Sequence, residues 1–266
     1  MPHVDINGRS IYYELHGEGE ETLTLLNGLT MSTIGWTPQI ADFSKNFRLL
    51  LLDMCGQGKS ARPDEGIYPL IRQADDIAAL LNHLGIARTH LLGISYGGVV
   101  AQHFVVRHRE KVNKLVLTDT LACGDEATSA FWDSMVLAQE AGGPKLRFRV
   151  MLPMTFGSPF LKAAAAMIPA FEQADGLIPW PVVKALSEAL NGFDMREQHK
   201  TFDVETLVMV GEMDRFTPYY QAKMIAEGIP GAKFRVLPGV GHAPTFENPP
   251  LFNQTVLSFL QGTMTG

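Results

Sequence analysis

Short uninterrupted runs of apolar residues alternate along the chain with segments in which apolar positions recur every three or four residues. A short continuous run is typical of a strand buried on both faces of a sheet. Spacing of three and four is typical of a helix with one buried face. The predicted buried strands span residues 22–26, 48–52, 90–92, 114–117, 207–210 and 233–237. The alternation predicts an α/β protein with a mostly parallel central sheet and helices on both faces.

The N-terminal residues predict a hairpin ahead of this sheet. Asn7-Gly8 separates residues 3–6 from residues 10–15, and this dipeptide is typical of a type I′ turn. Helices are predicted between the buried strands and near the end of the chain, over residues 71–84, 99–105, 220–226 and 252–260.

One long segment breaks the alternation. Residues 124–200 contain no clear strand and are rich in Met, Phe, Ala and Pro, whereas a linker would be polar and poor in aromatic residues. We therefore predict a core of residues 1–123 and 201–266, with a helical cap of residues 124–200 inserted after the sixth core strand. The prolines expected to interrupt its helices are Pro153, Pro159, Pro169, Pro179 and Pro181.

Composition and charge exclude several classes of function. The chain has 266 residues, of which 46% are hydrophobic and 19% charged, and its formal net charge is −6. A chain of this length buries enough surface to fold without disulfides or metals. No run of Lys or Arg could follow a phosphate backbone, so we expect no nucleic-acid partner.

The cysteines and the chain start bear on location. Cys55 and Cys123 lie in no Cys-x-x-Cys pair and near no histidine cluster, so we expect reduced thiols and no zinc site. The first residues lack the pattern of a signal peptide, and no stretch approaches 18 apolar residues. We therefore expect a cytoplasmic protein that makes no membrane contact. The formation of a homo-oligomer stays open.

The strongest chemical signal is Gly-Ile-Ser-Tyr-Gly at residues 93–97. It follows a predicted strand and precedes a predicted helix, which is the context that a Gly-x-Ser-x-Gly nucleophile turn requires. The glycines leave room for a sharp turn that exposes the Ser95 hydroxyl near the N-terminus of the helix. Ser95 is therefore the predicted nucleophile.

A serine hydroxyl needs a base, and the base needs an acid to orient it. His242 is the predicted base because it stands in a loop after the last predicted strand. Asp214 is the predicted acid, and it gives the order Ser95, Asp214, His242 that hydrolases with this turn use. Asp119, after residues 114–117, is the alternative acid.

Two backbone amides are predicted to form an oxyanion hole. One belongs to Tyr96, the residue after the nucleophile. The other belongs to Leu29, in the loop after the first buried strand, where Gly28 lets the backbone come close.

These motifs together make the chain resemble the α/β-hydrolase fold superfamily, and within it the esterases and lactonases that carry a cap. The resemblance covers nearly the whole chain. Two positions depart from the usual pattern, Asn27 where the family usually has His and Cys55 where it usually has Arg or Pro. The matching pieces are Asn27-Gly28 and residues 53–60, 93–98, 211–214, 241–242 and 247–253.

The cap is expected to cover the nucleophile with apolar side chains suited to an acyl or alcohol pocket. Arg147 and Arg149 are candidates for holding a substrate carboxylate, as an enol-lactone would require. The residues expected to line the pocket are Trp36, Trp132, Met135, Met154 and Phe156.

These features predict a serine hydrolase, of the carboxylesterase type, that cleaves carboxylic esters of small to medium apolar groups through an acyl-enzyme. No metal and no cofactor are expected, and the partner is a small ester or lactone substrate. The same residues leave open a lactonase, a C–C bond hydrolase, an acyltransferase or perhydrolase, and a ligand-binding relative without turnover. Fold and triad do not fix the substrate.

Overall fold

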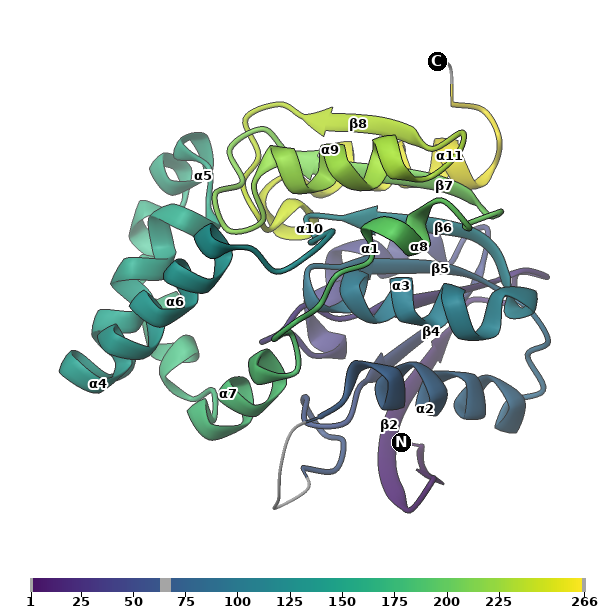
Figure 1. The fold of residues 1–266 in the computed structure, drawn as a ribbon, viewed down its shortest axis with the longest axis horizontal. Helices are drawn as coiled ribbons and strands as arrows, with labels where there is room; N and C mark the ends of the chain where they lie inside the picture. The colour runs from purple at the N-terminus through teal and green to yellow at the C-terminus, as the bar shows by residue number, and fades with distance from the viewer. Residues whose placement is uncertain (1, 63–67, 265–266) are drawn as a thin grey trace.

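A single mixed sheet organises the molecule. The computed structural model describes residues 2–62 and 68–264. Their strands form an eight-stranded sheet in the order β1-β2-β4-β3-β5-β6-β7-β8 (Figure 1). β1 and β2 pair antiparallel, β2 also pairs antiparallel with β4, and all other neighbours are parallel. The strands are β1 (His3–Ile6), β2 (Arg9–His16), β3 (Thr22–Leu26), β4 (Arg48–Asp53), β5 (Thr89–Ile94), β6 (Val112–Thr118), β7 (Glu205–Gly211) and β8 (Lys233–Leu237).

The predicted strands and the hairpin are confirmed. Asn7 and Gly8 have φ values of 52° and 78°, and a type I′ turn needs positive φ at both positions. The continuous apolar runs arise because the central strands are covered on both faces. In β4, Leu50 packs into the cluster on one face of the sheet and Leu51 into the cluster on the other.

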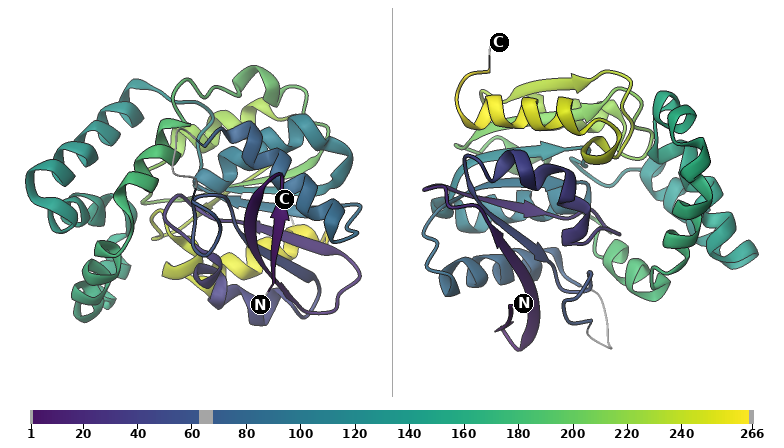
Figure 2. Two further views of the ribbon diagram at one scale, coloured as in Figure 1. Left: turned by 90° about the horizontal axis from the view of Figure 1, so that it is seen from below. Right: turned by 180° about the vertical axis from the view of Figure 1, so that it is seen from behind.

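Helices cover both faces of the sheet (Figure 2). One face is packed by α2 (Leu70–His83), α3 (Tyr96–His108) and α9 (Tyr219–Gly228), whose apolar side chains join one core cluster. The other is packed by α1 (Thr37–Phe43) and α11 (Pro249–Leu260), which join the second cluster. Within residues 2–62 and 68–264, no helix combines the length and the apolar character that crossing a membrane demands.

A separate group of helices stands beside the sheet (Figures 1 and 2). Its members are α4 (Glu126–Thr155), α5 (Ser158–Ala163), α6 (Ile168–Gly176) and α7 (Trp180–Glu188). The chain enters this group after β6, as predicted, and returns from it before β7.

Most prolines in this group lie where one helix has ended and the next begins, as expected. Pro159, Pro169 and Pro181 occupy the first turns of α5, α6 and α7, where a missing N–H costs no hydrogen bond. Pro153 lies inside α4 and does not end it, so the predicted interruption there is wrong. The real break in α4 is at Gly143, whose φ of 66° suits a residue without a Cβ.

The segment leaves and re-enters the core through a short neck. Cys123 and Asp194 form an antiparallel bridge, and the Met195 amide donates to the Ala122 carbonyl at 3.0 Å. The helix α8 (Arg196–His199) that follows packs on α9. The chain therefore comes back to the core a few residues before position 200, where the predicted cap ends.

His199 ties α8 to the core and is fully buried. Its Nε2 atom lies 2.7 Å from the Gln102 Oε1 atom of α3. Because the Gln102 amide nitrogen donates to the carbonyls of Gly98 and Leu121, this oxygen is the acceptor and the His199 nitrogen the donor. Burial lowers the pKa of His199 to about 4 from an ordinary 6.5.

This buried ring makes folding sensitive to acid. Between about pH 6.5 and pH 4 the unfolded chain binds a proton that the folded chain excludes, so the free energy of unfolding falls as the pH drops. From pH 7 to pH 5 this group should account for about 2 kcal/mol. Urea unfolding of the wild type and of His199→Gln at both pH values measures the difference. Equal losses in the two proteins would show that His199 is not the source.

Candidate active site

Ser95 lies at a strained turn between β5 and α3. Its φ of 53° and ψ of −120° fall where L-residues are rarely found. A Cβ atom at Gly93 would lie 2.4 Å from the Gly97 carbonyl oxygen, and one at Gly97 would lie 2.3 Å from the Leu26 carbonyl oxygen. The two glycines are therefore a steric requirement of the turn, as their spacing predicts.

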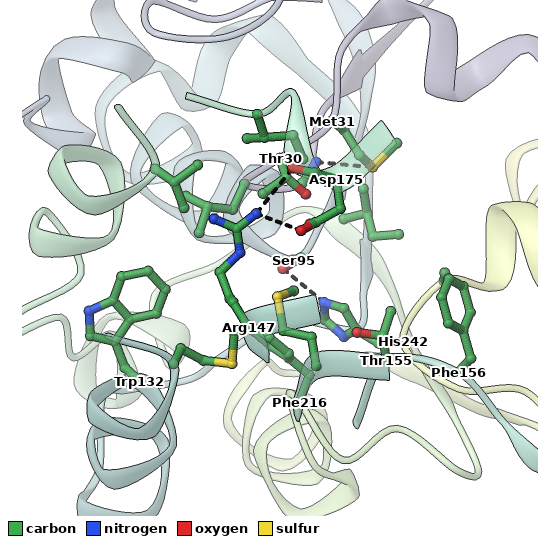
Figure 3. Close-up of a pocket in the computed structure, with 18 of the residues that line it drawn as sticks. Thr30, Met31, Ser95, Trp132, Arg147, Thr155, Phe156, Asp175, Phe216 and His242 are labelled. Atoms are coloured by element: carbon green, nitrogen blue, oxygen red, sulfur yellow. Dashed lines mark hydrogen bonds and ion pairs between the residues drawn. The ribbon is translucent and has the colours of Figure 1, made fainter. Parts of the chain in front are cut away.

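A chain of hydrogen bonds leads from Ser95 to a buried carboxylate. The His242 Nε2 atom lies 3.0 Å from the Ser95 Oγ atom (Figure 3). The Nδ1 atom of the same ring lies 2.9 Å from the Asp214 Oδ2 atom. Asp214 follows β7 and His242 follows β8, so neighbouring parallel strands bring both to the same edge of the sheet as Ser95. The structure thus brings together the three residues predicted from chain order.

The His242 ring is held by residues that the sequence did not single out. Its backbone amide donates to the Thr155 carbonyl at 2.6 Å, which links the loop to the end of α4. The Phe216 ring stacks on the imidazole, with centroids 4.8 Å apart. No local motif marks Thr155 or Phe216, because their contacts exist only once β7, β8 and α4 have met.

Asp214 is built to stay ionised. Burial would raise the pKa of its carboxyl, but the charge of His242 and hydrogen bonds from His242 and Thr217 lower the pKa overall. The Thr217 hydroxyl donates to Oδ2 at 2.6 Å, and the amides of Phe216 and Thr217 donate to Oδ1 at 2.8 and 3.0 Å. A carboxylate with this many donors can hold a neighbouring imidazolium.

Asp119, the alternative acid, lies directly beside this pair. It is fully buried, and one atom each of Asp119, Asp214 and His242 lie within 4.8 Å of one another. Burial and the adjacent Asp214 charge raise the pKa of Asp119 well above its usual range. Its carboxyl accepts from the Gly211 amide at 2.8 Å and from the Thr118 hydroxyl at 2.5 Å. Burial and the neighbouring charge of Asp214 thus both favour the uncharged form of Asp119.

These three side chains also have the donor types of a metal site. Both nitrogens of His242 and both carboxylate oxygens of Asp214 are already hydrogen-bonded within the protein. The cluster is accounted for by the chain from Ser95 to Asp214.

The two amides expected in the oxyanion hole come from different elements. Tyr96 is the first residue of α3, where amides have no acceptor within the helix. Leu29 follows β3 and lies on the cavity that contains Ser95. Neither amide donates a hydrogen bond to another residue in the described part of the chain. The Tyr96 side chain itself packs in the core.

Asn27 and Trp36 hold the Leu29 loop from behind. Trp36 is fully buried and donates its indole N–H to the Asn27 Oδ1 atom at 2.8 Å. The Asn27 amide nitrogen donates to the Leu52 carbonyl of β4 at 2.9 Å. The structure thus places Trp36 beneath the loop and away from the cavity lining where we expected it, because its N–H needs this buried acceptor.

A cavity of about 240 Å³ opens above Ser95 and His242, between the strand ends and the separate helices. Of the residues expected to line it, Trp132, Met135 and Phe156 do so. Met154 does not, because the lining positions on this turn of α4 are Met151 and Thr155.

The two arginines of α4 differ sharply. Arg147 is 3% exposed, lines the cavity and pairs with Asp175. Arg149 has a side chain that is 54% exposed, and it pairs with Glu172 outside the cavity. Only Arg147 can meet a ligand in this cavity.

Comparisons with known proteins identify the family to which this fold belongs. Residues 21–249 match the family described as the alpha/beta hydrolase fold. A curated relative from Caulobacter sp. (strain K31), named "Putative carbamate hydrolase RutD", is 28% identical over 257 residues, which cover 95% of this chain and 96% of that protein. The chain therefore belongs to the α/β-hydrolase fold family.

Solved structures extend the likeness to the whole chain. An enol-lactonase from Burkholderia xenovorans LB400 has a TM-score of 0.88 at 26% identity, and the match covers 98% of this chain and 100% of that one. A thermophilic esterase from Thermogutta terrifontis has a TM-score of 0.87 at 26% identity, and the match covers 100% of both chains. The resemblance predicted from the sequence motifs is confirmed.

Matched amide variants distinguish the roles of the two adjoining carboxyls. Asp214→Asn removes the charge that orients His242 and should lower kcat by about 10³–10⁴-fold. Asp119→Asn puts an isosteric neutral group where burial already favours an uncharged carboxyl, and it should stay within about tenfold of the wild type. Initial rates on one aryl ester at neutral pH compare them. The reverse order of losses would make Asp119 the acid.

Proposed function

We propose that the chain is a serine hydrolase that cleaves carboxylic esters of small to medium apolar groups through an acyl-enzyme. The observation that carries this proposal is the hydrogen-bonded chain from Ser95 to Asp214 at the base of a largely apolar cavity. A serine becomes a nucleophile when an oriented imidazole can take its proton, and this arrangement supplies one.

In the proposed reaction the Ser95 Oγ atom attacks the ester carbonyl while His242 Nε2 accepts the hydroxyl proton. The negative charge of Asp214 stabilises the resulting imidazolium. His242 then returns the proton to the departing alcohol, which leaves an acyl group on Ser95. Water, deprotonated by His242, releases the acid and restores the serine.

The oxyanion would be held by the amides of Leu29 and Tyr96. The N-terminus of α3 adds a favourable partial positive charge beside the second amide. Such donors act most strongly on the charge that develops in the transition state, and each is worth several kcal/mol in a dry site.

The helices α4, α6 and α7 would act as the cap. Together with the loops between them, they supply most of the apolar lining, including Trp132, Met135 and Val183. A cavity of about 240 Å³ suits a small or medium acyl or alcohol group and excludes water from the acyl-enzyme.

A lactonase is the second candidate. The observation that favours it is the enol-lactonase from Burkholderia xenovorans LB400, whose fold matches 98% of this chain at a TM-score of 0.88. A lactone is a cyclic ester, so the same residues would open it with the alcohol still attached to the product. The relatives whose name includes carbamate hydrolase make an aryl carbamate a third substrate to include.

A substrate panel tests the proposal. Aryl esters of graded acyl length, lactones and an aryl carbamate are compared by kcat/KM, and short to medium aryl esters should be the best. Ser95→Ala should reduce the turnover of every substrate by about 10⁴-fold or more. Ser134→Ala, at an exposed serine on α4, should match the wild type. Undiminished esterase activity in Ser95→Ala would contradict the proposed mechanism.

A further inference from the structure

An ion pair forms a polar patch in an otherwise apolar part of the cavity. The Arg147 Nη2 atom lies 2.5 Å from the Asp175 Oδ2 atom, and both residues line the cavity that contains Ser95 (Figure 3). The side chain of Arg147 is 3% exposed and that of Asp175 is 13% exposed. A buried guanidinium is costly unless its charge and its N–H groups are satisfied.

The charge of Arg147 is already compensated within the protein. Besides the carboxylate of Asp175, Arg147 donates to the Asp175 carbonyl at 3.1 Å and to the Gln139 Oε1 atom at 2.9 Å. The Trp180 ring lies 5.0 Å from the guanidinium carbon. The patch is therefore close to neutral overall, although its two members are charged.

Some hydrogen-bonding capacity of the pair is left unused. A guanidinium has five N–H groups. Arg147 donates three hydrogen bonds to residues in the described part of the chain, and none of them comes from Nε. The Asp175 Oδ1 atom accepts from no residue in the described ranges. The pair thus has both donors and an acceptor that no residue in the described ranges satisfies.

This arrangement discriminates between three kinds of ligand group. A carboxylate would meet a guanidinium that Asp175 has already neutralised, and it would be repelled by Asp175 itself. A hydrocarbon would cover the unused N–H groups without pairing them. An uncharged carboxamide accepts from Arg147 and donates to Asp175, so it satisfies both members.

We propose that the Arg147–Asp175 pair is a substrate-binding subsite for an uncharged carboxamide-type group, carried by the substrate away from the ester that Ser95 attacks. The inference rests on the proposed ester hydrolysis and names its substrate class. It replaces the expectation that Arg147 holds a substrate carboxylate, because that expectation did not include Asp175.

Arg147 also links three helices. It lies on α4 and contacts Asp175 on α6 and Trp180 at the start of α7. A merely structural link would change the turnover of all substrates alike when it is broken. A subsite would change the ratio between substrates that differ only at the distal group. Selectivity is therefore the readout that separates the two roles.

The experiment uses three p-nitrophenyl esters with acyl chains of equal length that end in a carboxamide, a carboxylate or an isosteric branched alkyl group. For the wild type, kcat/KM of the carboxamide ester should exceed that of each other ester by about tenfold, which corresponds to about 1.4 kcal/mol. A preference for the carboxylate ester or for the alkyl ester would overturn the proposal.

Asp175→Asn gives the sharper test, because it keeps the shape of the side chain and leaves the Arg147 charge uncompensated. The preference for carboxamide over carboxylate should shrink by about tenfold or reverse. Glu172→Gln, on the same helix but paired with Arg149 outside the cavity, is the matched control and should keep the wild-type ratio. An equal loss on all three esters in Asp175→Asn, or an unchanged ratio, would overturn the proposal.

A binding measurement separates this inference from the proposed chemistry. Calorimetry with Ser95→Ala compares hexanamide with hexanoate, and hexanamide should bind about tenfold more tightly. If the wild type turned over no ester but this preference held, the proposed reaction would fail and the subsite would stand. If esters were cleaved and hexanoate bound equally well or better, only the subsite would fail.

Discussion

The conformation of the chain at Ser95 is the constraint on which the site depends. A serine with φ of 53° is tolerated because β5 and α3 fix it from both sides, and because Gly93 and Gly97 leave no Cβ where backbone oxygens lie. This turn places the hydroxyl at the ends of the parallel strands. The loops after β7 and β8 end at the same edge, so His242 and Asp214 reach Ser95 from positions more than a hundred residues away in the chain.

The electrostatics of the site follow from placing two carboxyls side by side in the interior. Burial opposes the ionisation of both Asp119 and Asp214. Only Asp214 has the imidazole and three hydrogen-bond donors that favour its charged form. Because like charges this close repel, the charge of Asp214 adds to burial in raising the pKa of Asp119, whereas the donors around Asp214 lower its own pKa. At Arg147, likewise, the carboxylate of Asp175 compensates the guanidinium charge without any ligand.

Much of the fold was readable from the sequence because local chemistry dictates it. The strands over 22–26 and 233–237 match their predicted limits, because burial on both faces requires a continuous apolar run. Asn7-Gly8 forms the predicted turn, because positive φ favours Asn and Gly. Chain order and the Gly-x-Ser-x-Gly turn likewise identified the three residues now joined by hydrogen bonds. Contacts between residues far apart in the chain have no such local sequence signal. The burial of Trp36 under Asn27, the stacking of Phe216 on His242 and the Arg147–Asp175 pair each depend on elements that meet only in the folded chain. Pro153 was predicted wrongly because a proline inside a helix and one that starts a helix look alike in sequence.

The proposed reaction depends on activation of the Ser95 hydroxyl by His242. Its most direct test is labelling of the whole protein with a fluorophosphonate, followed by peptide mass spectrometry, in the wild type and in His242→Ala. We expect one adduct, on Ser95, formed rapidly in the wild type and far more slowly without the imidazole. An adduct on another residue, or labelling of Ser95 at the same rate in both proteins, would contradict it.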